Sequence, residues 1–161
     1  MPALCETAGV RVSAKADYAV RAMAQLAADS GTGPITAARL AEEQAIPVKF
    51  LHAVLTELRR ARLVRSTRGA DGGFELARAA EEITLAEVLR AVDGPLVNVH
   101  EESLTTLDYP GPAKSLREVW MAARVSMRNV FEHVTVADLS AGELPGSVRE
   151  LATTYRDDVR Y

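Results

Sequence analysis

Residues 46–76 read IPVKFLHAVLTELRRARLVRSTRGADGGFEL, and this stretch decides the fold. Pro47 can open a helix, because the first helical turn makes no use of the missing N–H. The next apolar side chains recur at the spacing of one helix face: Phe50, Leu51, Val54, Leu55 and Leu58. A strand at 63–67, a glycine turn at 69–73 and a returning strand at 74–76 follow. A helix followed by a β-hairpin predicts a winged helix-turn-helix.

The charge of the same stretch favours a surface for nucleic acid. Between Lys49 and Arg68 there are six Lys or Arg residues and one acid, Glu57, which gives a local charge of +5. The face of the predicted helix opposite the apolar one carries Lys49, His52, Ala53, Thr56 and Arg59. A helix and hairpin whose basic face is merely solvated is the alternative interpretation.

Composition places the chain among ordinary globular proteins. It has 161 residues, of which 48% are hydrophobic and 25% charged, and its net charge is −3. Residues 11–94 carry a net charge of +1 and residues 95–161 a net charge of −3, so a basic patch precedes an acidic second half. The single cysteine, Cys5, excludes an intramolecular disulfide and any metal site built from two cysteines of one chain. With no signal pattern and no long apolar run, a cytoplasmic protein is expected.

The first half predicts a short N-terminal extension, residues 1–11, and a winged domain, residues 12–95. Ser13 and Thr36 are suited to cap two helices, separated by a turn cluster at 29–34 and joined to the third helix by a short connection at 45–47. The inward face of the first helix is expected to consist of Ala16, Ala19, Val20, Met23, Leu26 and Ala27. Thr84 and Glu87 form a capping box in a helix over 81–92.

The second half predicts a dimerisation element. Residues 96–111 are expected to be a loop, and residues 112–140 a long helix, over 113–134, followed by a short one capped by Thr135. The long helix carries a seam with spacings of 4, 3, 4, 3 and 4, which a second copy of the chain can bury. Its members are Leu116, Trp120, Ala123, Met127, Val130 and Val134, widened by Val119 and Phe131. Folding of this helix back onto its own domain is the alternative. Residues 141–161 are expected to be a tail that packs loosely or frays.

Six motifs of the chain resemble one known family. They are RVSAKADYAVRA at 11–22, LAEEQ at 40–44, IPxxFL at 46–51, LRRARLV at 58–64, RGxxGGF at 68–74 and ITLAEVLRAVDGPL at 83–96. In this order they resemble the Rrf2 family of bacterial winged helix-turn-helix transcription regulators. The match covers about residues 11–96, whereas the tail is similar to the family in plan only.

The resemblance implies a mainly helical homodimer that binds double-stranded DNA at a near-palindromic operator. The DNA-reading positions that it implies are Pro47, Lys49 and His52 on the third helix and Arg68 with Gly69 in the wing. Arg68 is similar to the wing arginine of the family that enters the minor groove. It also implies that Arg11, Lys15 and Arg59 lie near phosphates, and Thr56 completes the exposed helix face. The operator, the effector and the sign of regulation stay open.

The chain departs from the family at one feature. Many members hold an iron–sulfur cluster on three cysteines in the loop before the long helix, but this loop, residues 97–114, contains no cysteine here. No cofactor is therefore expected. A metal held by His100 with Glu101 or Asp108, and a redox role for Cys5 across a dimer, are the weaker alternatives.

Three classes of function are candidates. The first is a sequence-specific transcription regulator without a cluster, which responds to a small ligand, to a protein, or to neither. The second is a winged domain that binds a protein partner; a steep salt dependence of binding would favour DNA instead. An enzyme is excluded by the lack of a nucleophile elbow, a Walker loop or paired catalytic side chains. The glycine turn at 69–73 is no phosphate loop, because a strand follows it rather than a helix.

Overall fold

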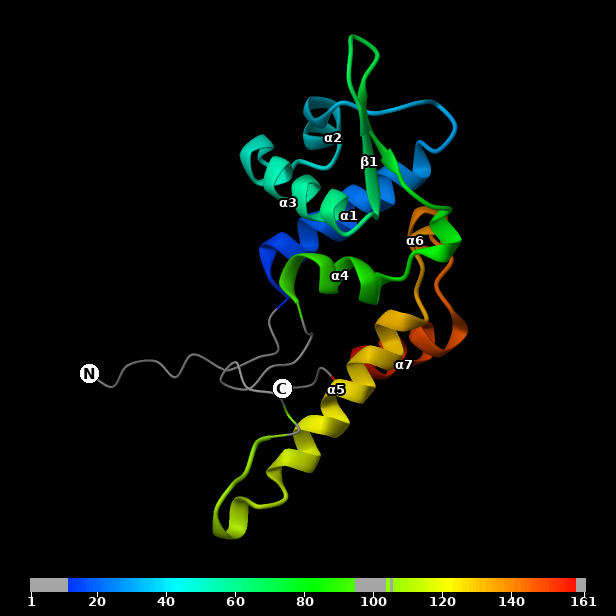
Figure 1. Cartoon of the computed structure of the whole chain (residues 1–161). Coiled ribbons are helices and arrows are strands. Elements are labelled where there is room, and N and C mark those ends of the chain that lie inside the picture. Colours follow the sequence, from blue (N-terminus) through cyan, green and yellow to red (C-terminus); the bar gives the residue numbers. More distant parts are fainter. Residues whose placement is uncertain (1–11, 95–103, 105, 159–161) are drawn as a thin grey trace, which may run out of the picture.

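The computed structural model describes residues 12–94, 104 and 106–158. In this part of the chain most residues are helical, and one small antiparallel sheet projects as a hairpin from one end of the helical array (Figure 1). The helices are α1 (Ala14–Ala28), α2 (Ala37–Glu43), α3 (Val48–Arg60), α4 (Leu85–Asp93), α5 (Leu116–Glu132), α6 (Val136–Ala141) and α7 (Gly146–Asp158). The strands are β1 (Val64–Thr67) and β2 (Gly73–Leu76), and two 3₁₀ turns are η1 (Ala80–Glu82) and η2 (Gly111–Ala113). This is the winged helix-turn-helix that the sequence predicts.

The helix caps lie where the sequence places them. The Ser13 hydroxyl accepts a hydrogen bond from the Ala16 N–H at 2.9 Å, and the Thr36 hydroxyl accepts one from the Arg39 N–H at 3.3 Å. The Thr84–Glu87 capping box is complete at α4, and a second box, Thr135 with Asp138, begins α6. Each box satisfies N–H groups that the first turn leaves unpaired, so these helices begin at defined residues.

The core is built around α1, which packs against α3, α4, α6 and β2. The side chains that α1 buries are Ala16, Ala19, Ala22, Met23 and Leu26. Three of them are alanines, which let the neighbouring helices approach closely. The buried face of α3 consists of Leu51, Val54, Leu55 and Leu58, so one side of this helix is anchored and the other is left exposed.

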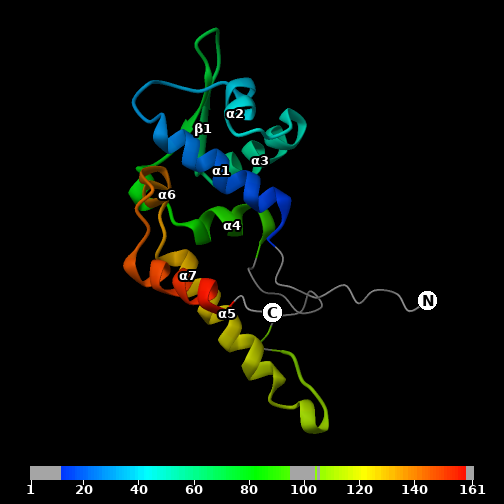
Figure 2. The same cartoon turned by 180° about the vertical axis from the view of Figure 1, so that it is seen from behind.

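The segment after α5 returns to the winged domain and completes its core. The Leu85 N–H donates to the Val134 carbonyl and the Val136 N–H donates to the Ile83 carbonyl, both at 2.9 Å. Val136 is fully buried, and α6 packs along α1. Both views show α6 beside α1, while α5 runs away from the winged domain (Figures 1 and 2). The core of the winged domain thus includes residues that follow the long helix α5 in the sequence.

Several expected elements differ in the structure. Phe50, expected on the buried face of α3, is 57% exposed, because its position lies at the flank of that face and its ring rests on Tyr18 of α1. The helix expected over 81–92 consists of η1 and α4, and the one over 113–134 begins at Leu116 and ends at Glu132. The expected tail contains α7, although Leu151 and Tyr155 on this helix are 59% and 73% exposed. None of the described helices is long and apolar enough to cross a membrane.

Candidate nucleic-acid interface

The exposed face of α3 and the wing adjoin each other. The β1 strand follows α3 directly and packs against it, so the wing rises beside the helix (Figure 1). The Arg59 guanidinium reaches the Ser66 hydroxyl at 3.4 Å and connects the end of α3 to β1. Lys49, His52 and Arg59 are exposed, whereas Thr56 is half-buried and its hydroxyl donates to the His52 carbonyl at 2.8 Å. Pro47 is the exposed N-cap of α3.

The wing is anchored at its base and open at its tip. Val64 pairs with Leu76 and Thr67 with Gly73 across the hairpin, and Phe74 pairs on its other side with Ile35. The Ile35 N–H donates to the Phe74 carbonyl at 2.9 Å, and the Phe74 N–H donates back at 2.7 Å. A Cβ atom on Gly73 would lie 2.5 Å from the Ile35 backbone, so only glycine permits this approach.

Arg68 lies at the start of the exposed turn. It is followed by Gly69, whose φ of +112° is a conformation that favours glycine. The Gly72 N–H donates to the Gly69 carbonyl at 3.1 Å and closes the turn. The side chain of Arg68 is exposed, so a wing tip of this shape can present its guanidinium to a partner.

Most cations of this surface are free of acidic partners. Within the described residues, five cations between 49 and 68 make no ion pair: Lys49, Arg59, Arg60, Arg62 and Arg68. The sixth, Arg65, pairs with Glu75 on the opposite strand at 3.0 Å. Exposed cations without an acidic partner attract a polyanion, because no internal carboxylate neutralises them.

The structure pairs one expected phosphate contact internally. Lys15 of α1 lies 2.7 Å from Glu57 of α3, so its charge is countered by an acid of the helix that it flanks. Arg11 lies outside the described residues. Lys49, His52, Thr56 and Arg59 share α3, and Arg68 and Gly69 belong to the adjoining wing.

Two exposed arginines near the end of α3 were not among the predicted DNA contacts. Arg60 and Arg62 are exposed beside Arg59, and Arg62 adopts a positive φ of 59° in the turn between α3 and β1. The run of three arginines in four residues was the available signal. An aromatic contact was also missed: the rings of Tyr18 and Phe50 lie 6.3 Å apart, and the Arg21 guanidinium lies 5.8 Å from the Tyr18 ring.

The expected dimer seam divides into two groups. Leu116, Trp120, Met127 and Val130 are half-buried, Ala123 is exposed and Val119 is 55% exposed, so none of these six is fully buried within the chain. Phe131 packs against the winged core, and Val134 lies beyond the end of α5 and is 2% exposed inside that core. Val134 is therefore already covered by its own chain.

The donor groups do not fit an iron–sulfur cluster. Such clusters are held by several thiolates, and the chain has one cysteine, Cys5, which lies outside the described residues. Over the described ranges, no three His, Cys, Asp or Glu side chains converge as metal ligands. Of the residues considered for a metal in the loop, Asp108 is exposed, and His100 and Glu101 lie outside the described residues.

Known proteins share this architecture over most of the chain. Residues 12–142 match the Rrf2 family, described as iron-dependent transcriptional regulators. A Mycobacterium tuberculosis protein described as an HTH-type transcriptional regulator, Rv1287, is 51% identical over 147 residues, which are 91% of each chain. The solved structure of CymR, the global cysteine regulator of B. subtilis, is 31% identical with a TM-score of 0.70, over 81% of this chain and 96% of that one. IscR of T. potens is 30% identical with a TM-score of 0.68, over 88% of this chain and 97% of that one.

These relatives are regulators and not enzymes, and their likeness extends over the helix-turn-helix, the wing and the long helix. The chain therefore belongs to the Rrf2 family and is a DNA-binding transcription regulator.

Proposed function

We propose that the chain regulates transcription in the cytoplasm as a homodimer on a near-palindromic operator, without an iron–sulfur cluster. In this proposal α3 enters the major groove and the wing enters the adjacent minor groove. The observation that carries it is the set of five unpaired cations on α3, on the turn after it and at the wing tip. A duplex offers a row of phosphates to such a surface and a groove to the helix beside it.

The proposed dimer rests on the surface of α5. Not one side chain of α5 is fully buried within the chain, although Leu116, Trp120, Met127 and Val130 recur along one side of it. A second surface can bury the apolar area of this row that the chain leaves exposed. A second α5, related by a two-fold axis, presents the same row and would place two α3 helices on successive half-sites.

Each contact residue has a role that follows from its chemistry. Lys49 and His52 lie in the first turns of α3, where recognition helices reach base edges. Arg68 is suited to a narrow minor groove, which concentrates negative potential around a guanidinium. Arg59, Arg60 and Arg62 would hold phosphates. Lys15 can contact a phosphate only if its ion pair with Glu57 breaks when DNA binds.

The absence of several thiolates separates this chain from cluster-holding regulators. With one cysteine in the sequence, a monomer cannot provide the ligands of a cluster, so the purified protein should be colourless. An anaerobic preparation with stoichiometric iron and sulfide and visible absorbance would contradict this part of the proposal.

The test of the interface is a salt titration of DNA affinity by fluorescence anisotropy. Arg68→Ala is expected to weaken binding by about 5- to 150-fold, since a lost groove contact of this kind costs about 1–3 kcal/mol. Arg149→Ala, on exposed α7, is the matched control and should bind as the wild type does. Affinity of the Arg68 variant equal to that of the control would refute the wing contact. A shallow salt dependence of the wild type would favour a protein partner instead.

A further inference from the structure

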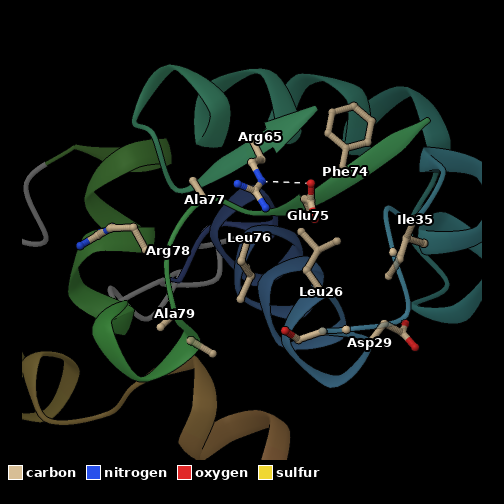
Figure 3. A pocket seen from close by; sticks show the side chains of 14 residues that line it. Leu26, Asp29, Ile35, Arg65, Phe74, Glu75, Leu76, Ala77, Arg78 and Ala79 are labelled. Atoms are coloured by element: carbon tan, nitrogen blue, oxygen red, sulfur yellow. Dashed lines mark ion pairs between the residues drawn. The ribbon is translucent and has the colours of Figure 1, made fainter. Parts of the chain in front are cut away.

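A groove beside the wing has no part in the proposed DNA contacts. It has a volume of about 490 Å³ and lies between β2 and the loop that joins α1 to α2 (Figure 3). Leu26, Ile35 and Leu76 give it an apolar floor, and the Leu26 and Leu76 side chains point into its centre in the close view. Its size is within the range of sites that bind small molecules.

One wall of the groove is an open strand edge. The N–H and C=O groups of Phe74 point away from β1 and form hydrogen bonds with the backbone of Ile35. Leu76 lies two residues further along the same strand, so its N–H and C=O face the same side. In the described part of the chain these two groups have no hydrogen-bond partner. A donor and an acceptor are thus presented together at the wall of the groove.

The open edge has the length of a single residue. On one side Ile35 already occupies the position beside Phe74. On the other side β2 ends at Leu76, and the chain bends at Ala77 and Arg78. A long strand from a partner protein has no ladder to extend here. The groove is therefore suited to a small molecule that imitates one residue of a strand, rather than to a docking segment.

The charges around the groove balance one another. Its lining contains two acids, Asp29 and Glu75, and two arginines, Arg65 and Arg78. Arg65 pairs with Glu75 at 3.0 Å, as the dashed line in Figure 3 marks, and Arg78 pairs with Glu87 at 2.8 Å. Asp29 accepts a hydrogen bond from Gln25 at 2.8 Å and lies 3.6 Å from Arg39. Because every charge has a partner, the site favours a ligand without net charge.

We propose that this groove binds a small, neutral, peptide-like molecule: one apolar residue flanked by two amides. Its N–H donates to the Leu76 carbonyl and its C=O accepts from the Leu76 N–H, as in a hydrogen-bonded antiparallel pair. Its apolar side chain rests on Leu26 and Leu76. Since β2 continues from Leu76 to Gly73 at the wing, occupancy of the groove alters DNA binding by the wing. The site itself does not depend on the proposed operator contacts; only this coupling does.

The probe is N-acetyl-leucine N-methylamide, titrated into the ¹⁵N-labelled full chain and followed by NMR. The Leu76 amide resonance should shift and saturate with a dissociation constant of about 1 mM or lower, which is the affinity expected of a ligand this small. N-acetyl-proline N-methylamide lacks the donor N–H and should bind at least about tenfold more weakly.

Two variants locate the site. Ala79 lies on the exposed rim of the groove, so Ala79→Trp should fill the groove and abolish binding of the probe. Ala70→Trp, on the exposed turn of the wing and outside the lining, is the control and should leave binding of the probe unchanged. No shift at Leu76, or equal binding by the Ala79 variant, would overturn the site.

The coupling is tested by measuring DNA affinity with and without a saturating amount of the probe. A change of about fivefold or more is expected for coupled sites. Saturable binding that leaves DNA affinity unchanged would overturn the link to the wing. The Arg68→Ala variant should bind the probe with the wild-type affinity although its affinity for DNA is lower. The two measurements therefore distinguish an error in the proposed groove site from an error in the proposed operator contacts.

Discussion

Replacement of Met127 by aspartate is expected to separate the proposed dimer. Met127 lies in the middle of the α5 row, is half-buried within its own chain, and does not belong to the side chains that pack against the winged core. Full burial of a fully exposed methionine side chain contributes about 1.5–3 kcal/mol, but a dimer can bury only the minor part of Met127 that the chain leaves exposed, which is about a third at most. For the two copies of a symmetric dimer this loss is about 1–2 kcal/mol, so by itself it raises the dissociation constant about 5–30-fold. Desolvation of the two new carboxylates increases the effect further.

Met121 provides a control with the identical substitution. It lies six residues earlier, about 120° around the helix from Met127, and is 40% exposed. Sedimentation velocity over a range of concentrations should show the Met127→Asp protein as a monomer where the wild type and the Met121→Asp protein are dimers. Circular dichroism should show the same helix content in all three, because no side chain of α5 is fully buried. A Met127→Asp dimer as stable as the wild type would refute the assignment of the seam, and so would equal dissociation of both variants.

Three other substitutions probe the wing, the cap of α4 and the recognition helix. Gly73→Ala should cost about 1–3 kcal/mol in thermal unfolding, because the new Cβ would lie 2.5 Å from the Ile35 backbone; Gly146→Ala, with open space around it, should cost nothing. Burial tends to raise the pKa of Glu87, but the Thr84 N–H and the Arg78 guanidinium outweigh it and hold the pKa below its ordinary value of 4.5. The contribution of Glu87 to the free energy of unfolding is therefore complete above about pH 4.5 and is lost as the pH falls through the lower folded pKa. Glu87→Gln should therefore make the free energy of unfolding less dependent on pH in the acid range. An unchanged dependence on pH would contradict this. His52→Ala should relax base preference at one symmetric pair of operator positions by about 1–3 kcal/mol with little change in salt slope, and identical selected sequences would show that His52 reads no base.

Local signals predicted most of the winged domain. The caps at Ser13, Thr36 and Thr84 depend on residues within one helical turn, and the glycines of the wing mark a turn wherever the rest of the chain lies. The apolar spacing predicts Phe50 in the core, because a period of 3.6 residues does not decide whether a residue at the flank of an apolar face is buried. The neighbour that accommodates its ring, Tyr18, belongs to a distant helix.

Contacts between segments that are distant along the chain could not be predicted from the sequence. Nothing local to Val134 shows that its carbonyl accepts the Leu85 N–H, so a heptad count extended the seam into residues that the core covers. The pairing of Ile35 with Phe74, which anchors the wing and leaves the Leu76 edge open, joins a loop to a strand about forty residues away. The Lys15–Glu57 pair likewise joins α1 to α3, and it changed the environment of an expected phosphate contact.

Selection of binding sites from random double-stranded DNA by the purified full chain tests the central claim most directly. A two-fold dimer that presents two α3 helices and two wings should enrich an inverted repeat, whose half-sites are separated by about one helical turn or a multiple of it. Bases facing the wing should be A·T-rich, because a narrow minor groove attracts Arg68. Enrichment of such a repeat is the predicted result. Failure to enrich any sequence, or enrichment of a single asymmetric site, would contradict a homodimer that reads its operator with α3 and the wing.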